Sequence, residues 1–224
     1  LNIPFKKVKT KQMSYLTVEE MIKLIGVIDK SSEYGYRDYM IILLMYESAI
    51  RVSELINVRL IDFRFSKPYS IKIVGKGNKQ RYVPLSEQFI EKIQEYVLSL
   101  NNKKLETDFL FTNHSNNKLT RAGVSHILNK YVTIARKNNL SLFQENVTPH
   151  SLRHTKAMHL LQDDVNLIYI RDILGHSSIQ TTEIYARADS ARLRQAIEKS
   201  YKELSTETKC KWQEEEIINW LKSF

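Results

Sequence analysis

The residues best suited to chemistry lie in short motifs that lead to one tyrosine, Tyr185. His150 and Arg153 are three residues apart in a segment expected to be helical, so their side chains face the same way. His176 follows an expected helix end at Gly175, and Tyr185 lies nine residues after His176. Taken singly, each has an ordinary interpretation: a solvated polar stripe, a helix stop, or one of twelve tyrosines that pack in the interior.

Two more candidate cations lie upstream. Arg51 precedes Glu54 by three residues, which indicates either an ordinary surface ion pair on a helix or a carboxylate that holds an arginine ready to grip a phosphate. Lys76 lies in the glycine-rich segment 75–79 between two expected strands, where it points either into a neighbouring site or into water. The segment lacks the G-x-x-x-x-G-K-[ST] spacing of a P-loop, so we expect no bound nucleotide.

His150 and His154 have the i, i+4 spacing of zinc ligands. No Glu stands between them as in H-E-x-x-H, and no third ligand is evident in the sequence. The single cysteine, Cys210, excludes a C-x-x-C zinc site. We therefore expect no metal and no other cofactor.

Together these groups suit attack on a DNA phosphodiester. Negative charge builds around the phosphorus in the transition state, and two guanidiniums can stabilise it by binding the non-bridging oxygens. A phenol attacks once a base takes its proton, and a lysine can protonate the departing 5′ oxygen. The side chains that would carry the reaction, with Glu54 in support, are Arg51, Lys76, His150, Arg153, His176 and Tyr185.

Helical patterns dominate the elements that must position these groups. Thr17 and Glu20 form a capping box that opens the first helix, and Thr148 with Pro149 begins the helix of His150. Further helices are expected over residues 36–48, 51–55, 86–100, 120–137, 148–162, 166–175, 178–184, 189–204 and 214–222. Residues 69–74 and 80–83 predict a β-hairpin, and residues 109–111 a brief further strand. The predicted class is mainly α with a small antiparallel β-sheet (α+β).

Bulk properties restrict the class of protein further. The chain of 224 residues is 42% hydrophobic, enough for one substantial core or two small ones. Its net charge of +9 favours polyanionic partners, either nucleic acid or an acidic membrane surface. The longest apolar run, residues 40–46, is too short to span a bilayer, and no signal peptide is evident. A single cysteine is typical of a reducing compartment, so we expect a cytoplasmic protein with no membrane partner.

In their order along the chain, the motifs resemble the active-site pattern of the tyrosine recombinases, also called the phage integrase family. They are A-I-R-V-S-E-L at 49–55, G-K-G-N-K at 75–79, H-S-L-R-H at 150–154, L-G-H at 174–176, and Tyr185. The resemblance spans about residues 16–188 and fills all six family active-site positions. It implies the family's catalytic-domain fold and a site-specific recombinase or integrase that works through a covalent 3′-phosphotyrosine intermediate, without ATP.

The resemblance also implies a role for each site residue. Arg51 and Arg153 would bind the scissile phosphate, and His176 would hydrogen-bond it. His150 would assist deprotonation of Tyr185, which would become joined to the 3′ phosphate. The lysine of the G-K-G-N-K motif would protonate the departing 5′ hydroxyl.

Domain organisation and partners follow from the same resemblance. It implies a C-shaped clamp on double-stranded DNA and a homotetramer across two duplexes. We interpret residues 1–13 as a basic linker from a missing N-terminal core-binding domain, and residues 14–205 as the catalytic domain. Residues 206–224 form a tail with a short helix, which either docks on a neighbouring subunit or packs on its own core.

Two alternatives fit the same residues. A type IB topoisomerase-like enzyme would relax supercoils by the same phosphotyrosine step, and a non-catalytic DNA-binding regulator would use the six side chains as phosphate contacts. The short spacing from L-G-H to Tyr185 and the brief tail favour a recombinase. The composition, rich in Lys and Ile, is typical of a bacterial mobile element, so integration or excision of such an element is the expected use.

Overall fold

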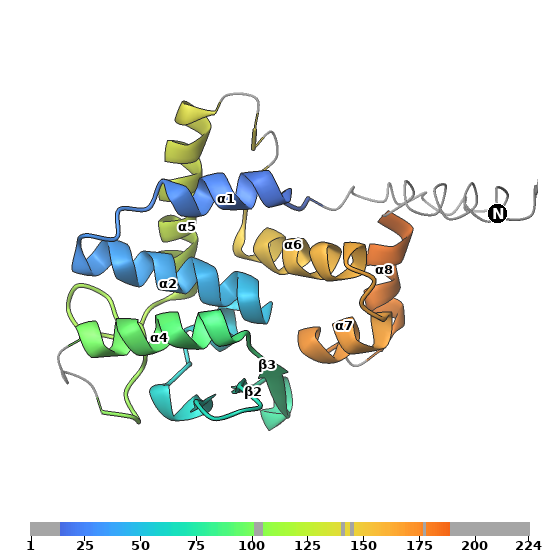
Figure 1. Ribbon diagram of the computed structural model, residues 1–224, viewed down its shortest axis with the longest axis horizontal. Coiled ribbons are helices and arrows are strands. Elements are labelled where there is room, and N and C mark those ends of the chain that lie inside the picture. The colour runs from blue at the N-terminus through green and yellow to red at the C-terminus, as the bar shows by residue number, and fades with distance from the viewer. Residues whose placement is uncertain (1–13, 101–104, 140–141, 144–145, 177, 189–224) are drawn as a thin grey trace, which may run out of the picture. The chain divides into compact units, whose positions relative to one another are not determined.

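The computed structural model describes residues 14–100, 105–139, 142–143, 146–176 and 178–188 (Figure 1). Its helices are α1 (Val18–Gly26), α2 (Glu33–Ser48), α3 (Val52–Leu55), α4 (Glu87–Ser99), α5 (Arg121–Asn138), α6 (Pro149–Gln162), α7 (Leu167–Leu174) and α8 (Gln180–Ala188). The strands are β1 (Phe63–Arg64), β2 (Ser70–Val74) and β3 (Gln80–Pro84), with short 3-10 helices η1 (Leu60–Asp62) and η2 (Lys76–Asn78). The predicted class, mainly α with a small antiparallel sheet, is confirmed.

Tertiary contacts divide the chain into two compact units, Leu1–Tyr185 and Ala186–Phe224. The helices and strands named above belong to the first unit, except for the last turn of α8, which belongs to the second. The basic tether expected at residues 1–13 and the helices expected over 189–204 and 214–222 lie outside the described residues.

The expected hairpin of β2 and β3 is present, and Ile71 pairs with Val83 on its buried face. The third strand is β1, whose Phe63 pairs with Ile71. The strand expected at residues 109–111 is wrong, because Phe109 makes only an isolated bridge to Arg59. Leu110 and Phe111 are both buried, whereas successive residues of a strand point to opposite faces; these two fill the core instead.

Capping residues place the helix starts. The Thr17–Glu20 capping box at α1 is confirmed, and so is Thr148 as the cap before Pro149 at α6. The α2 helix begins three residues earlier than residue 36, because the Ser32 side chain accepts a hydrogen bond from a backbone amide of the first turn. These caps satisfy amides that have no partner within the helix.

The α2 helix is the centre of the main core. It lies between α1 and α4 in Figure 1 and also packs against α6. Its apolar side chains that are at most 1% exposed are Met40, Ile41, Ile42, Leu44 and Met45. Each such burial contributes about 1.5–3 kcal/mol. The end of α2, which leads directly to Arg51, is therefore held firmly.

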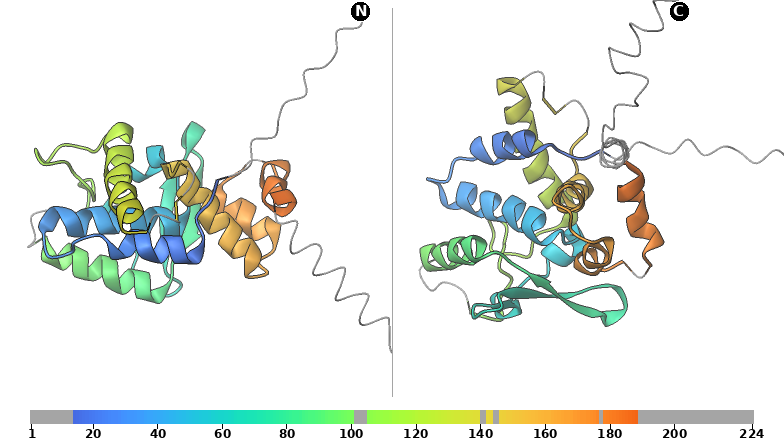
Figure 2. Two further views of the ribbon diagram at one scale, coloured as in Figure 1. Left: turned by 90° about the horizontal axis from the view of Figure 1, so that it is seen from above. Right: turned by 45° about the vertical axis from the view of Figure 1, so that its right-hand side comes forward.

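A second, smaller apolar cluster joins α6, α7 and α8, and its buried members are Ala49, Ala157, Met158, Ile170, Leu174 and Tyr185. The hairpin lies beside α7 in the views of Figures 1 and 2, in agreement with contacts between β3 and α7. In the described part of the chain, no helix combines the length and the apolar character needed to cross a bilayer.

Candidate active site

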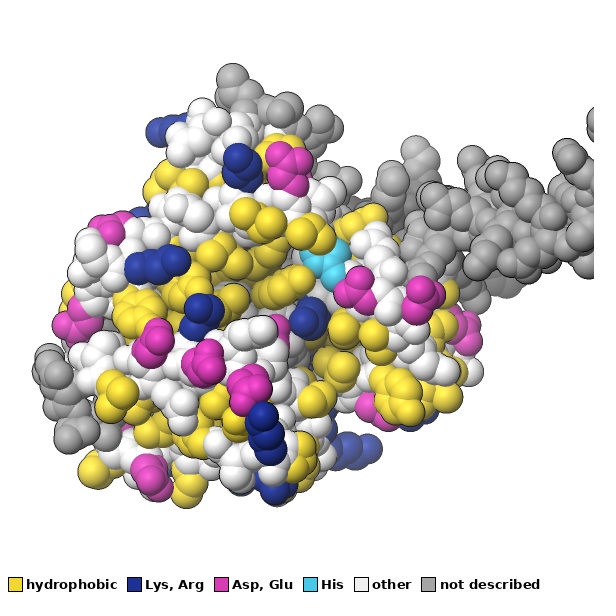
Figure 3. Space-filling model, in the orientation of Figure 1, with side chains coloured by type: hydrophobic (Ala, Val, Ile, Leu, Met, Phe, Trp, Pro, Cys, Tyr) yellow, Lys and Arg dark blue, Asp and Glu magenta, His cyan; other side chains and the backbone are white. Residues whose placement is uncertain are grey.

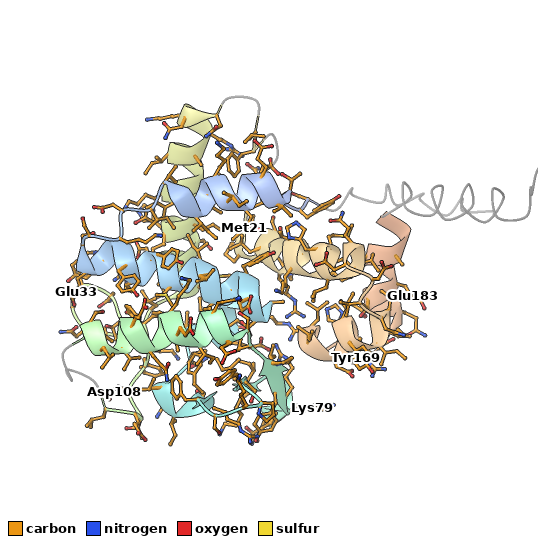
Figure 4. All side chains as sticks on the ribbon, in the orientation of Figure 1. Met21, Glu33, Lys79, Asp108, Tyr169 and Glu183 are labelled. Carbon is orange, nitrogen blue, oxygen red and sulfur yellow. The ribbon has the colours of Figure 1, made fainter. Side chains whose placement is uncertain are left out.

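Five of the six predicted site residues have described side chains, and they come from four segments: the N-terminus of α3, the α6 helix, the residue pair after α7, and α8. Figure 4 labels Lys79 on the hairpin, Tyr169 on α7 and Glu183 on α8, the elements that border these segments. On the face seen in Figure 3, Lys and Arg side chains alternate with Asp and Glu and form no single patch. The local arrangement of cations therefore says more about the site than net charge does.

Arg153 is a nearly fully buried cation, 2% exposed, on α6. Its Nη1 donates to the Ala49 carbonyl at 2.8 Å, and its Nη2 donates to the Leu174 carbonyl at 2.5 Å. Both carbonyls lie at helix C-termini, where intrahelical donors are lacking. Burial lowers the pKa of Arg153 to about 10, with a further contribution from Arg51, so the guanidinium stays charged at neutral pH.

Arg51 precedes α3 and is partly exposed. Its backbone amide donates to Glu54 Oε2 at 2.8 Å, and its Nη1 donates to Glu54 Oε1 at 3.0 Å. Its Nη2 lies 3.4 Å from the Gly175 carbonyl oxygen. The two arginines thus bond consecutive carbonyls, Leu174 and Gly175, which brings the two guanidiniums to one place.

Glu54 is buried and accepts hydrogen bonds from two arginines. Besides Arg51, Arg81 of β3 donates from Nη1 to Oε1 at 2.9 Å and from Nη2 to Oε2 at 2.8 Å. Burial alone would raise the pKa of Glu54, but the bonds from Arg81 and Arg51 outweigh it and hold the pKa below its ordinary value. Of the two interpretations of the Arg51–Glu54 spacing, the structure shows a carboxylate that fixes the arginine.

Tyr185 is 1% exposed, and its hydroxyl lies 2.9 Å from His154 Nδ1. His154 in turn stacks on His150, with ring centroids 5.1 Å apart and an interplanar angle of 13°. The histidine that meets the hydroxyl is therefore one helical turn beyond His150, the residue expected to assist deprotonation. The i, i+4 histidine pair, considered above as a zinc motif, is a stack beside the tyrosine.

The protonation states at this stack follow from burial. Burial lowers the pKa of His154 to about 4, with smaller contributions from His150 and Arg153, so its ring is neutral at neutral pH. Burial raises the pKa of Tyr185, although Arg153 and Arg51 counteract this. A neutral phenol therefore donates to the imidazole nitrogen.

His176 lies just after α7, where Gly175 adopts a left-handed φ of 63° that ends the helix. Its Nδ1 is 3.0 Å from the hydroxyl of Thr182, a fully buried residue of α8. Burial lowers the pKa of His176 to about 4, with smaller contributions from Arg153 and Arg51. When Thr182 donates this bond, the hydrogen is on Nε2, which can then donate to an anion.

Lys76 is in η2, inside the turn between β2 and β3. The turn is closed by a hydrogen bond from the Gly75 amide to the Lys79 carbonyl at 2.8 Å. The side chain of Lys76 lies outside the described residues, so its role stays a prediction. Among the residues described, no three His, Cys, Asp or Glu side chains are grouped as metal ligands would be.

Two contacts in the site were not predicted from the sequence: Arg81 with Glu54, and His154 with Tyr185. A signal for Arg81 was available, because residues 81 and 83 share one face of β3 and Val83 is fully buried. A cation on the inward face of a strand needs a buried partner. The partner of Tyr185 carried no comparable signal, since His150 and His154 share a helix face.

Comparison with known proteins gives the family of the chain. The chain matches the phage integrase family over residues 14–192. It is 35% identical over 192 residues to tyrosine recombinase XerD of Staphylococcus haemolyticus, with 84% of this chain and 63% of that protein covered. It is 37% identical over 188 residues to tyrosine recombinase XerA of Pyrococcus horikoshii, with 83% of this chain and 60% of that protein covered.

Solved structures of similar proteins have a similar fold. The XerH site-specific recombinase bound to palindromic difH substrate, in a post-cleavage complex, gives a TM-score of 0.72 at 29% identity, covering 88% of this chain and 57% of that one. The catalytic domain of bacteriophage HP1 integrase gives a TM-score of 0.57 at 23% identity, covering 83% and 94%, a likeness of fold alone. The chain spans about three fifths of the length of the two curated relatives above. Since the family match extends over most of its residues, the chain belongs to the phage integrase family.

Proposed function

We propose that this chain carries the catalytic centre of a site-specific DNA recombinase, which cleaves and rejoins strands through a covalent 3′-phosphotyrosine. The observation that carries the proposal is the pair Arg51 and Arg153, which bond consecutive carbonyls and lie near enough to Tyr185 to act against the rise in its pKa. Two fixed guanidiniums side by side suit the oxygens of a single phosphate. The family membership and the DNA complex of the related XerH support double-stranded DNA as the partner.

In the proposed step, the Tyr185 oxygen attacks the phosphorus and the bond from phosphorus to the 5′ oxygen breaks. The new bond joins the 3′ phosphate to the tyrosine, and the phenolic proton passes to an imidazole nitrogen. The departing 5′ oxygen takes a proton from Lys76. Attack by a 5′ hydroxyl reverses every transfer, so a strand is rejoined with no net loss of phosphodiester bonds and no ATP.

The hydrogen bond of Tyr185 indicates which histidine would accept the phenolic proton. The Tyr185 hydroxyl bonds His154 Nδ1, so His154 is the proposed acceptor in this arrangement. His150 stacks on His154. Its pKa is lowered mainly by partial burial and to a smaller extent by Arg153 and Arg51. We keep His150 and His176 as neighbours of the phosphate, where a neutral imidazole can donate to an oxygen.

Partners and domain organisation remain part of the proposal. The curated relatives are longer than this chain, in keeping with a core-binding domain joined through residues 1–13. We propose a catalytic domain over residues 14–205 and a tail at 206–224 that docks on a neighbouring subunit in a DNA-bound homotetramer. The proposed setting is the cytoplasm, and the proposed use is integration or excision of a mobile element.

A covalent-trapping experiment tests the function. A library of nicked duplexes with a randomised central segment is incubated with the protein, and DNA that stays attached through denaturation is sequenced. A single nicked "suicide" duplex made from the recovered sequence should then give a protein–DNA adduct on a denaturing gel. Tyr185→Phe, which keeps the ring and removes the hydroxyl, should give none.

Each alternative has its own outcome in the same experiment. A wild-type protein that binds DNA of the library but leaves none attached through denaturation is a DNA-binding regulator, and the proposed function is then wrong. Adducts formed equally on unrelated sequences, with relaxation of supercoiled plasmid, would indicate a topoisomerase-like enzyme. EDTA should leave adduct formation unchanged, and strong inhibition by EDTA would contradict a reaction carried by side chains alone.

A further inference from the structure

Arg81 of β3 links three elements of the site without lying among the six predicted site residues. Its side chain is 14% exposed. Both terminal nitrogens donate to the Glu54 carboxylate, at 2.9 and 2.8 Å, and its Nε donates to the Ile173 carbonyl at 3.1 Å. One guanidinium therefore joins the hairpin, α3 and the C-terminal end of α7.

The packing around this link is close. A Cβ added at Gly175 would lie 2.8 Å from Arg81 Cδ and 2.9 Å from Arg81 Nε. A Cβ added at Gly75 would lie 3.4 Å from Glu54 Oε1. The Arg81–Glu54 pair is thus enclosed between the glycine of the L-G-H motif and the first glycine of the hairpin turn.

The elements that Arg81 joins are those that present the phosphate-binding groups. Glu54 holds the Arg51 amide and guanidinium. The end of α7 supplies the two carbonyls that Arg51 and Arg153 bond, and it leads directly to His176. A shift of Arg81 would therefore be transmitted to both arginines of the proposed phosphate site.

The net charge of the cluster around Arg81 indicates a role other than stabilising the fold. A buried ion pair contributes little net stability, because desolvation offsets the attraction. Here three arginines (51, 81 and 153) surround one carboxylate, so the cluster has an excess of positive charge. Such an excess suits a site that binds an anion.

We propose that Arg81 is a positioning residue for phosphate activation: it fixes Glu54 and the end of α7 so that Arg51 and Arg153 are aligned on the scissile phosphate. The inference rests on the proposed function. We assign Arg81 no direct contact with the phosphate, because its side chain is only 14% exposed and all three of its nitrogens already donate to Ile173 and Glu54.

The test compares two substrates for single-turnover adduct formation on the nicked suicide duplex. One substrate has a normal scissile phosphate. The other has a methylphosphonate at that position, which lacks the negative charge that Arg51 and Arg153 would bind. Arg81→Gln should form adduct roughly tenfold to a hundredfold more slowly on the phosphate, the range typical of a lost supporting contact. On the methylphosphonate the deficit should shrink, as it should for Arg51→Gln.

Two further variants control the comparison. Arg81→Lys keeps the charge but loses the paired geometry, so it should fall between wild type and Arg81→Gln. Arg64→Gln removes an exposed arginine of β1 in the same sheet and should leave both rates unchanged. Circular dichroism and urea unfolding verify that each variant is folded at the assay temperature.

The outcomes separate the two claims. An equal deficit of Arg81→Gln on both substrates, or a wild-type rate, would refute the positioning role while wild-type adducts uphold the proposed function. If the wild-type protein forms no adduct with any duplex of the library, the proposed function fails and the positioning role fails with it.

Discussion

Replacing Gly175 with alanine tests how tightly the end of α7 is held against β3. Gly175 has a φ of +63°, and a residue with a Cβ in this region costs about 1–2 kcal/mol. The new Cβ would also collide with Arg81 Cδ and Nε, at 2.8 and 2.9 Å. Arg81 cannot move aside without loss of a hydrogen bond to a charged group, which is worth about 1.5–3 kcal/mol. We expect Gly175→Ala to lower the free energy of unfolding by about 2.5–5 kcal/mol.

Two other glycines separate the contributions. Gly77 has a φ of +72° with no atom within 4 Å of an added Cβ, so Gly77→Ala should lose only the backbone cost of about 1–2 kcal/mol. Gly26 ends α1 with open space around it, and Gly26→Ala should cause no loss. Urea unfolding followed by far-UV circular dichroism measures all three. Equal losses in Gly175→Ala and Gly77→Ala would show that the contact with Arg81 carries no weight, and the reasoning would fail.

Three further predictions concern α6 and the histidines near Tyr185. His154→Phe leaves the Tyr185 hydroxyl buried without its acceptor and should lower the free energy of unfolding by about 1–3 kcal/mol; adding Tyr185→Phe should restore part of the loss, and a double variant no more stable than the single one would contradict the hydrogen bond. Thr148→Ala removes the α6 cap, whose hydroxyl accepts from the Ser151 amide, and should lose about 1 kcal/mol in the same assay. Burial, reinforced by neighbouring cations, lowers the pKa values of His154 and His176 to about 4, whereas unfolded histidines titrate near 6.5. The unfolded chain therefore binds more protons than the folded chain between those pH values. The free energy of unfolding should have its full contribution from these histidines above about pH 6.5 and should fall as the pH drops toward about 4. In His176→Gln the fall measured by urea unfolding should be shallower, and an unchanged slope would count against the assignment.

Local signals in the sequence predict most elements of this fold. Capping residues and helical periods place α1, α4, α5 and α6 within about one residue of their observed starts, since caps act within one turn. The errors occur where tertiary packing decides. Residues 109–111 have strand-like composition, but Leu110 and Phe111 both fill the core. Strand β1 is only two residues long, too short for any alternation to reveal.

The site divides in the same way. The order of motifs predicts that Arg51, Arg153, His176 and Tyr185 meet, and the structure brings them into one cluster. Spacing does not decide whether His150 or His154 meets the hydroxyl, because both project from the same face of α6 and the choice depends on how α8 packs. A contact between residues 31 positions apart has no local pattern to indicate it.

The arginines and the nucleophile are prepared to different degrees. Arg51 and Arg153 are held by Glu54 and by backbone carbonyls at two helix ends, groups that stay in place without any contribution from a substrate. Fixed donors of this kind need little reorganisation when charge develops on a phosphate. Tyr185 is 1% exposed and bonded to His154, so its hydroxyl must be uncovered before it can reach a phosphorus atom. In the proposed reaction, the phosphate site is therefore assembled in advance, whereas the hydroxyl of Tyr185 on α8 must first be uncovered.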